Sequence, residues 1–317
     1  MPTPRFVAGD WGTSQLRLNL CADDGAAIDS KDGPGVAKLG GRVAEAFSKA
    51  VSDWDAQYGA LPTVLCGMAG STLGWREVPY LTCPIHPERI VDGVLRFEAE
   101  GRPLAIAPGL SCRNRLLGPD VMRGEETQIL GALRRDPGLA EGRHFLCMPG
   151  THAKWVVLRD GVIESFLTSL AGELFDVLGR NSVLVGPDAF TGTIAQGTFA
   201  RALEQSRLHP DAELIHLLFQ TRSRQLAGEF NPRDAAGFLS GLVIGQDVAG
   251  AVRLFREDLT DAMHVTIIGA PQISELYALA LEARGIASQR IDGALASLAG
   301  LEALQAALFR DGLAHAS

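Results

Sequence analysis

The chain has 317 residues, of which 46% are hydrophobic, and this is enough to fill the cores of two ordinary domains. Its formal net charge of −8 disfavours a nucleic-acid-binding surface, which needs clustered Lys and Arg. The five cysteines form no C-x-x-C pair, so neither a zinc site nor a disulfide framework is indicated. No signal-peptide core and no unbroken apolar run of bilayer-spanning length stand out. We therefore expect a cytoplasmic enzyme without nucleic-acid or membrane partners.

The first half of the chain opens with a strand, a Gly-rich turn and a second strand. An apolar run at 5–9 and an alternating pattern at 15–20 predict the two strands. Further along, the patterns predict a helix at 41–57, strands at 63–66 and 103–107, and a helix at 125–134. Alternation of strands and helices is typical of an α/β fold.

The opening pattern returns in the second half. A strand at 144–148, a Gly-Thr turn and a strand at 154–158 repeat the first three elements. A repeat of this size suggests a duplicated domain. The remaining patterns predict helices at 171–180, 187–206, 211–228, 232–253, 271–284 and 293–309, with one strand at 264–268. We expect domains at 1–118 and 119–317, with the last helix packing back on the first domain.

The two Gly-Thr turns are candidate phosphate sites. Gly12, Thr13 and Ser14 can offer backbone N–H groups and hydroxyls to a phosphate, and Asp10 beside them can hold Mg²⁺ through water. An ordinary hairpin explains the first turn about as well. The second turn, Gly150-Thr151, favours two phosphate grips, as a kinase needs. Neither a P-loop nor a G-x-G-x-x-G fingerprint is present.

Three further motifs are compatible with a nucleotide and a sugar. Glu125 begins a predicted helix and can accept a proton, although first-turn Glu is common for helix-dipole reasons alone. Gly269 ends a strand where a nucleoside could pack on bare backbone, and a plain strand-to-helix turn is the alternative. Gly70, Ser71 and Trp75 suit a sugar-facing loop, or a flexible loop capped by a buried Trp.

Several stretches resemble one known family. The chain is similar to the 2-dehydro-3-deoxygalactonokinases, which belong to the superfamily of actin, sugar kinases and heat-shock ATPases. The similar stretches are GDWGTSQLRL (9–18), CGMAGSTLGW (66–75), PDVMRGEETQILGAL (119–133), PGTHAKWV (149–156), SLAGELFDVL (169–178) and FLSGLVIGQDV (238–248). Ala153 and Ala69 depart mildly from the family pattern.

The resemblance implies an α/β fold of two ribonuclease-H-like lobes with an interlobe cleft for ATP and sugar. It implies transfer of the ATP γ-phosphate to the 6-hydroxyl of 2-dehydro-3-deoxy-D-galactonate, with Mg²⁺. Gly124-Glu125 stands where related sugar kinases have a Gly-Asp pair with the catalytic base, and Asp120 stays an alternative base. The acid also calls for an arginine, for which Arg123 is the first candidate and Arg113 the second, a solvated surface charge being the alternative for each.

Other functions remain open at this point. The same fold serves kinases for other keto-deoxy sugar acids or sugars, and regulatory actin-like ATPases that switch partners. A phosphatase acting on polyphosphate would want a strongly basic channel, which the net charge of −8 disfavours. A homodimer is among the assemblies that the sequence allows.

Overall fold

The computed structural model describes residues 2–186, 194–262 and 264–309, so the first residues of the helix expected at 187–206 lie outside the described residues. The chain divides into two compact units. Unit 1 comprises Met1–Gly142, Leu158–Phe166 and Ile291–Ser317, and unit 2 comprises Arg143–Val157 and Leu167–Arg290. These units differ from the expected domains 1–118 and 119–317. The assignment of the sugar site to one domain and of the adenosine site to the other stays a prediction.

The main sheet of unit 1 has the strand order β3-β2-β1-β4-β7-β6. Strand β1 is antiparallel to β2 and parallel to β4, and β4 is parallel to β7. A smaller sheet has the order β5-β8-β9. The bounds are β1 Phe6–Trp11, β2 Gln15–Cys21, β3 Ala27–Pro34, β4 Thr63–Gly67, β5 Leu81–Thr82, β6 Leu95–Ala99, β7 Arg102–Ile106, β8 Leu110–Arg113 and β9 Pro119–Met122.

The second main sheet has the order β12-β11-β10-β13-β14. In this sheet β10 is central, with β11 and β12 on one side and β13 and β14 on the other. In the main sheet of unit 1, β1 is flanked in the same way by β2 and β3 on one side and by β4 and β7 on the other. The shared order agrees with the repeated strand-turn-strand pattern, and the α/β fold expected from the sequence is confirmed. The bounds are β10 Arg143–Met148, β11 Ala153–Arg159, β12 Val162–Ser169, β13 His264–Gly269 and β14 Ala287–Asp292.

The helices follow the expected periodic segments with three differences. The helix expected at 187–206 begins at Gln196, so the described residues 194–195 before it are not helical. The segment 211–228 forms two short helices on either side of Phe219, and α8 was not expected. The α-helices are α1 Val43–Tyr58, α2 Glu125–Arg135, α3 Ala171–Asn181, α4 Gln196–Leu208, α5 Leu214–Leu218, α6 Gln220–Leu226, α7 Pro232–Leu254, α8 Arg256–Ala262, α9 Pro271–Glu282 and α10 Gly293–Phe309. The 3-10 helices are η1 Val36–Lys38, η2 Met68–Gly70, η3 Pro87–Gly93 and η4 Pro137–Ala140.

Helices cover both faces of the main sheet in unit 1. Alternation along β1 sends Val7 and Trp11 to the face covered by α1, where Phe47 packs with them. The same alternation sends Phe6 and Ala8 to the opposite face, where the cluster includes residues of α2 and α10. By the same alternation, Asp10 near the end of β1 points to the same face as Phe6 and Ala8.

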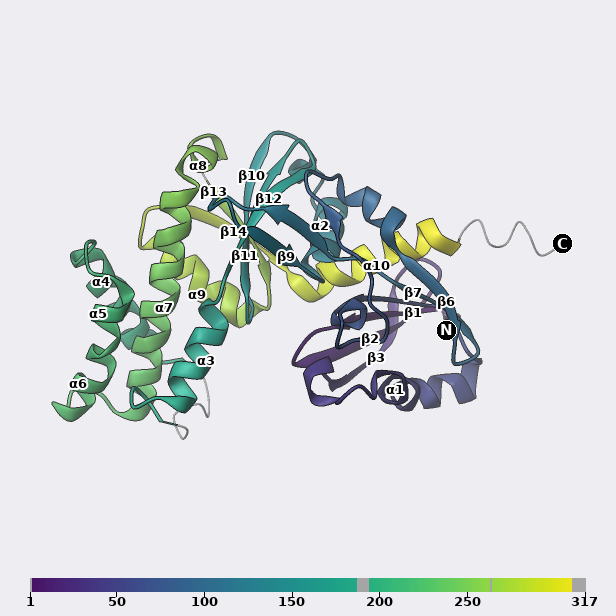
Figure 1. Cartoon of the computed structure of the whole chain (residues 1–317), viewed down its shortest axis with the longest axis horizontal. Helices are drawn as coiled ribbons and strands as arrows, with labels where there is room; N and C mark the ends of the chain where they lie inside the picture. The colour runs from purple at the N-terminus through teal and green to yellow at the C-terminus, as the bar shows by residue number, and fades with distance from the viewer. Residues whose placement is uncertain (1, 187–193, 263, 310–317) are drawn as a thin grey trace. The chain divides into compact units, whose positions relative to one another are not determined.

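Helices α2 and α10 cross at unusually short distance because each contributes a glycine (Figure 1). A Cβ on Gly131 would lie 1.8 Å from the carbonyl oxygen of Ala296, and a Cβ on Gly300 would lie 2.0 Å from that of Thr127. Real Cβ atoms do not approach backbone so closely, so the crossing requires glycine at both positions. The close crossing brings the start of α10 to the end of β1.

The core of unit 2 is built around the long helix α7. Asn231 and Asp234 form a capping box at its start, with Pro232 in the first helical turn. Inside, the half-buried Asp247 carboxylate accepts hydrogen bonds from Trp155 Nε1 and Tyr277 Oη, at 3.0 and 2.6 Å. Helix α7 is long and apolar enough to cross a membrane, contrary to the expectation that no segment is. Of an apolar 18-residue stretch of this helix, 78% is buried inside the protein, as in a core helix.

Candidate active site

Asp10 lies at the carboxyl end of β1, on the sheet face that α10 covers. The Ser297 hydroxyl of α10 donates a hydrogen bond to Asp10 Oδ2 at 3.1 Å. Burial raises the pKa of Asp10, the Ser297 hydrogen bond and the charge of Arg17 lower it, and the charge of Glu125 raises it. Asp10 Oδ1 lies 3.5 Å from where a Cβ on Gly67 would be, and Gly67 is also the residue against which Gly124, directly before Glu125, packs within unit 1.

The start of α2 is pressed against the end of β4. Gly124 has a φ of +109°, and a Cβ on it would lie 3.3 Å from the Cα of Gly67. From there the chain enters the helix with two glutamates. Glu125 is half-buried and accepts a hydrogen bond from the Arg123 N–H at 3.0 Å. Glu126 is wholly buried, and burial together with the Glu125 charge raises its pKa to about 8.

The first Gly-Thr turn joins β1 to β2 and is braced from behind. The Gly12 N–H donates to Gln15 O at 2.8 Å, which closes the hairpin. Gly35 lies so close to the turn that a Cβ on it would be 2.2 Å from Thr13 O. The side chains of Thr13 and Ser14 are exposed at the tip. The turn is thus rigid on its inner side and presents its hydroxyls outward, as a phosphate site would need.

The second Gly-Thr turn is braced by the start of α3. A Cβ on Gly172 would lie 2.2 Å from Gly150 O, so only glycine permits this approach. The Glu173 N–H donates to Thr151 O at 2.8 Å. The carboxylate of Glu173 also pairs with His152 Nε2. Among the described residues, no atom lies within 4 Å of where a Cβ on Gly150 would be.

Gly269 lies at the end of β13 and packs on the residue that precedes this second turn. A Cβ on Gly269 would meet Pro149 Cγ and Ser274 Oγ, each at 3.1 Å. Gly269 is buried. Its lack of a side chain therefore serves the close approach of Pro149, and any nucleoside contact would involve the backbone beyond it.

The predicted sugar loop follows β4 as helix η2. The Ser71 hydroxyl donates to a carbonyl of its own turn, Met68 O, at 2.8 Å. The Trp75 ring packs between two phenylalanines of the unit 1 core, with ring centroids 5.1 Å from Phe47 and 6.1 Å from Phe97. Trp75 is therefore half-buried by core packing, and only its exposed part could contact a sugar.

Arg123 lies against this loop. Its Nη2 donates to Val78 O at 2.7 Å, and its guanidinium lies over the Tyr80 ring at 4.3 Å from the centroid. A Cβ on Gly70 would be 2.7 Å from Arg123 Nη1. Within the part of the chain that the structure describes, Arg123 Nε and Nη1 are buried without a hydrogen-bond partner. Buried donors without partners are costly, and an anionic group would satisfy them.

The remaining candidates lie on the small sheet. Arg113 is exposed at the end of β8, in register with Pro119. The carboxylate of Asp120 accepts hydrogen bonds from Asn114 Nδ2 at 3.0 Å and from the Val121 N–H at 2.9 Å. Asp120 is therefore engaged in local structure, as turn aspartates often are.

No group of three or more His, Cys, Asp or Glu side chains that could hold a metal ion occurs among residues 2–186, 194–262 and 264–309. A cation site in this region would rest on Asp10 with few protein ligands. Such a donor set fits Mg²⁺, which keeps several waters and is commonly held by one or two carboxylates together with substrate phosphates.

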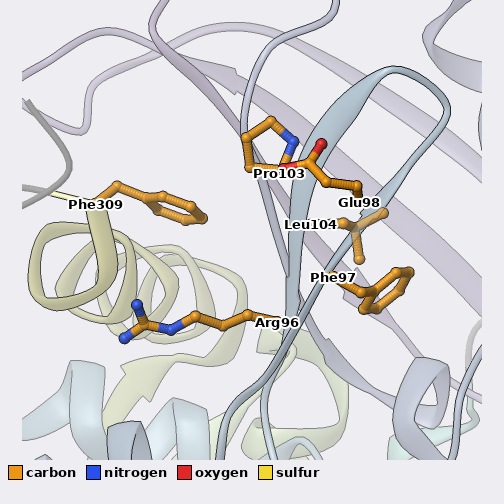
Figure 2. A pocket seen from close by; sticks show the side chains of 6 residues that line it. All are labelled: Arg96, Phe97, Glu98, Pro103, Leu104 and Phe309. Carbon is orange, nitrogen blue, oxygen red and sulfur yellow. The ribbon is translucent and has the colours of Figure 1, made fainter. Parts of the chain in front are cut away.

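A pocket of about 300 Å³ lies away from these residues, at the β6–β7 edge of the unit 1 sheet (Figure 2). Its lining residues are Arg96, Phe97, Glu98, Pro103, Leu104 and Phe309. None of them belongs to the motifs predicted from the sequence, and the pocket contains no pair of carboxylates suited to phosphoryl transfer.

Sequence patterns did not point to Ser297, Glu126 or Gly172 as parts of the site. Ser297 lies 287 residues from Asp10, in a helix that is mostly apolar and lacks a clear polar face. Gly131 and Gly300 are the signal that could have been used, because a glycine inside a helix is costly unless it serves close packing.

Comparisons with known proteins agree along the whole chain. A family model described as 2-keto-3-deoxy-galactonokinase matches residues 10–304. A Rhizobium meliloti (strain 1021) protein described as a probable 2-dehydro-3-deoxygalactonokinase is 38% identical over 311 residues, covering 96% of this chain and 97% of the relative. The Escherichia coli (strain K12) 2-dehydro-3-deoxygalactonokinase is 30% identical, covering 95% and 98%.

A solved structure supports the same grouping. The crystal structure of a Sinorhizobium meliloti protein with the 2-dehydro-3-deoxygalactonokinase description superposes with a TM-score of 0.83 at 36% identity. It covers 96% of this chain and 97% of the solved one. The similarity in sequence and in fold thus extends over both units.

Proposed function

Because the chain belongs to the 2-keto-3-deoxy-galactonokinase family, we propose that it transfers the γ-phosphate of ATP to the 6-hydroxyl of 2-dehydro-3-deoxy-D-galactonate, in galactonate breakdown. The observation that carries the proposal is the match over residues 10–304, which includes every residue predicted for the site. The packing of both Asp10 and Gly124, the residue before Glu125, against Gly67 supports it, because phosphoryl transfer to a hydroxyl needs a base and an electrostatic partner for the phosphates.

The reaction needs one proton acceptor. Glu125 is proposed to take the proton of the 6-hydroxyl as its oxygen attacks the γ-phosphorus. A new P–O bond to the sugar forms while the bond between the γ-phosphorus and the β–γ bridging oxygen breaks, and ADP leaves. The hydrogen bond from the Arg123 N–H engages Glu125 Oε2 and limits how the carboxylate can turn.

The nucleotide is proposed to be held by both turns. Gly12, Thr13 and Ser14 would contact phosphate oxygens in unit 1, and Gly150 and Thr151 would do so in unit 2. The rigid bracing of each turn supports this role, since preorganised donors cost little to orient at the moment of reaction. The adenosine is proposed to lie on the backbone after Gly269.

Asp10 is proposed to hold Mg²⁺ through water. When bound, Mg²⁺ supplies positive charge that offsets the charge developing on the phosphates. The Ser297 hydrogen bond orients the Asp10 carboxylate, so one of its oxygens has a fixed direction.

The acidic sugar is proposed to contact Gly70, Ser71 and Trp75, with Arg123 or Arg113 binding its carboxylate. The buried Nε and Nη1 of Arg123 favour it over Arg113, which is exposed. We also propose that the enzyme acts in the cytoplasm, that residues 1–118 carry the sugar site apart from Arg123 and 119–317 the adenosine site, and that a homodimer is its assembly.

The decisive experiment is a coupled assay of ADP formation with a panel of sugar acids, neutral sugars and no acceptor. We expect 2-dehydro-3-deoxygalactonate to have the highest kcat/KM and to be required for turnover. Comparable kcat/KM for galactose or glycerol, with none for the keto acid, would refute the substrate. ATP turnover that does not depend on any acceptor would instead favour a regulatory ATPase.

The assignment of the base is tested by two isosteric variants. In Glu125→Gln, kcat should fall by about 10²–10⁴-fold with little change in KM for the acid, because the base is removed and the shape kept. Asp120→Asn should keep most of the activity, since Asp120 is engaged in its own turn. The opposite pattern would move the base to Asp120.

A further inference from the structure

His152 follows the second Gly-Thr turn, and its side chain is exposed and yet held in place. The imidazole is 44% exposed, and its Nε2 contacts Glu173 Oε2 at 2.5 Å. Glu173 lies in the first turn of α3. An exposed ion pair contributes little to stability, because both side chains lose freedom in forming it. Stability is thus a weak reason for this pair.

The partner carboxylate is fixed relative to the turn by backbone contacts. The Glu173 N–H donates to Thr151 O at 2.8 Å, and a Cβ on Gly172 would lie 2.2 Å from Gly150 O. The start of α3 is therefore packed directly on the peptides that precede His152. Glu173 holds the turn with its backbone and the imidazole with its side chain, so the ring has a set orientation.

The backbone of His152 is held as well. Its carbonyl oxygen accepts a hydrogen bond from Lys154 Nζ at 3.1 Å, and the Lys154 side chain is buried. Two successive carbonyl groups, those of Thr151 and His152, are thus engaged by neighbouring residues of unit 2. Bracing of this kind around a solvent-facing side chain is typical of a preorganised functional group.

The imidazole ring has two nitrogens, and one of them is engaged by Glu173. Within the residues that the structure describes, the hydrogen-bond partner of the ring is Glu173 at Nε2, and Nδ1 has none. A carboxylate beside one nitrogen favours the charged imidazole, in which both nitrogens donate. Nδ1–H is then a charged donor on an exposed turn, and an anion is the ligand that suits it.

The position of His152 along the turn indicates which anion it meets. Gly269, beyond which the adenosine is proposed to lie, packs on Pro149, and His152 is three residues further along the turn. The phosphates distal to the adenosine are therefore the groups within its reach. The carboxylate of the sugar acid is the other anion of the reaction, and the residues proposed to contact the acid belong to unit 1.

We propose that His152 is a catalytic residue whose Nδ1–H donates a hydrogen bond to an oxygen of the β- or γ-phosphate of ATP. Glu173 is the positioning residue that keeps the imidazole charged and oriented. The charged imidazole offsets negative charge on the phosphates as the bond between the γ-phosphorus and the bridging oxygen breaks, and it transfers no proton. The inference rests on the proposed function, in which Gly150 and Thr151 contact phosphate.

The test measures the affinity for adenylyl imidodiphosphate, a non-hydrolysable ATP analogue, and for AMP by calorimetry with Mg²⁺ present. In His152→Ala the Kd for the analogue should rise by about 10–100-fold, as the loss of a charged hydrogen bond does, and the Kd for AMP should not change. His152→Asn places an amide nitrogen near the position of Nδ1, so it should recover part of the lost affinity. With the acid as acceptor, kcat/KM for ATP should fall in the same order.

Glu173→Gln tests the positioning role. It keeps the backbone contact and an acceptor for Nε2 and removes the charge, so the Kd for the analogue should rise by less than in His152→Ala. In the His152→Ala background it should have no further effect, because Glu173 acts through the imidazole. The matched control is Glu204→Gln, which removes the exposed pair of Glu204 and Arg207 on α4 and should keep the wild-type Kd.

A wild-type Kd for the analogue in a folded His152→Ala overturns the proposal. An equal rise in the Kd for AMP also overturns it, because the whole turn would then have moved. Additive effects of the two substitutions overturn the role of Glu173. If His152→Ala does not fold, a wild-type Kd for the analogue in Glu173→Gln has the same force. If the wild type binds the analogue and phosphorylates no acid, the proposed function fails, and the affinities still decide for or against His152.

Discussion

The crossing of α2 and α10 offers a sharp test of the structure, through Gly131→Ala. The new Cβ would lie 1.8 Å from Ala296 O and 2.6 Å from Gly300 N. Both atoms belong to backbone, so the helices have to separate by more than an ångström. Overpacking typically costs about 1–3 kcal/mol. Because the neighbour is backbone, we expect the upper end of that range.

Alanine also offsets part of the cost. It is better than glycine inside a helix by about 1 kcal/mol. The net loss in the free energy of unfolding should therefore be about 2 kcal/mol. Gly250→Ala, near the C-terminal end of α7, is the matched control, because among the described residues nothing lies within 4 Å of its Cβ position. It should gain up to about 1 kcal/mol, so the two variants should differ by about 3 kcal/mol.

The assay is urea unfolding at pH 7, with Gly300→Ala and the double variant included. Gly300→Ala should behave like Gly131→Ala, since its Cβ would lie 2.0 Å from Thr127 O. The double variant should lose less than the sum, because helices already separated leave room for the second methyl group. Equal midpoints for Gly131→Ala and Gly250→Ala, or strict additivity of the pair, would refute the close crossing.

Four more predictions concern the site. Asp10→Ala should stay folded and lose about 10²-fold or more in kcat, as removal of a key electrostatic group does, and near-wild-type turnover would end its proposed role. Gly269→Val should raise KM for ATP more than KM for the acid, because the branched side chain presses on Pro149, 3.1 Å from the Cβ position, and equal KM values in a folded variant would contradict this. Arg123→Ala should raise KM for the acid more than Arg113→Ala does, and wild-type KM in both would exclude them as carboxylate ligands. Finally, burial raises the pKa of Glu126 to about 8 in the folded chain, against an ordinary value of 4.5 in the unfolded chain, so the free energy of unfolding of the wild type falls as pH rises from 4.5 to 8. Glu126→Gln lacks this loss, so in urea unfolding it should gain about 1.4 kcal/mol per pH unit relative to wild type over that range. Parallel curves of unfolding free energy against pH would contradict the buried carboxyl.

Local patterns were sufficient for much of the fold. The two strand-turn-strand units and most long helices were predicted, because alternation and helical periodicity reflect which side chains each element buries. The edge strands of both main sheets, β3, β6, β12 and β14, were missed, and so were the strands of the small sheet, β5, β8 and β9. The side chains of the edge strands are largely exposed or half-buried, so their sequences lack the apolar alternation that marks a buried strand.

The amino-acid sequence alone determined the family, the two Gly-Thr turns and the position of Glu125 at a helix start, because each depends on neighbours along the chain. Only the tertiary structure decided what surrounds them. Ser297 reaches Asp10 from the last helix because Gly131 and Gly300 let α10 approach α2. Glu126 is buried while Glu125 is only half-buried, since successive residues on a helix point about 100° apart and only one of them can face the core. Contacts between residues hundreds of positions apart leave no periodic signal, and they set the burial and the charge on which the chemistry of these carboxylates depends.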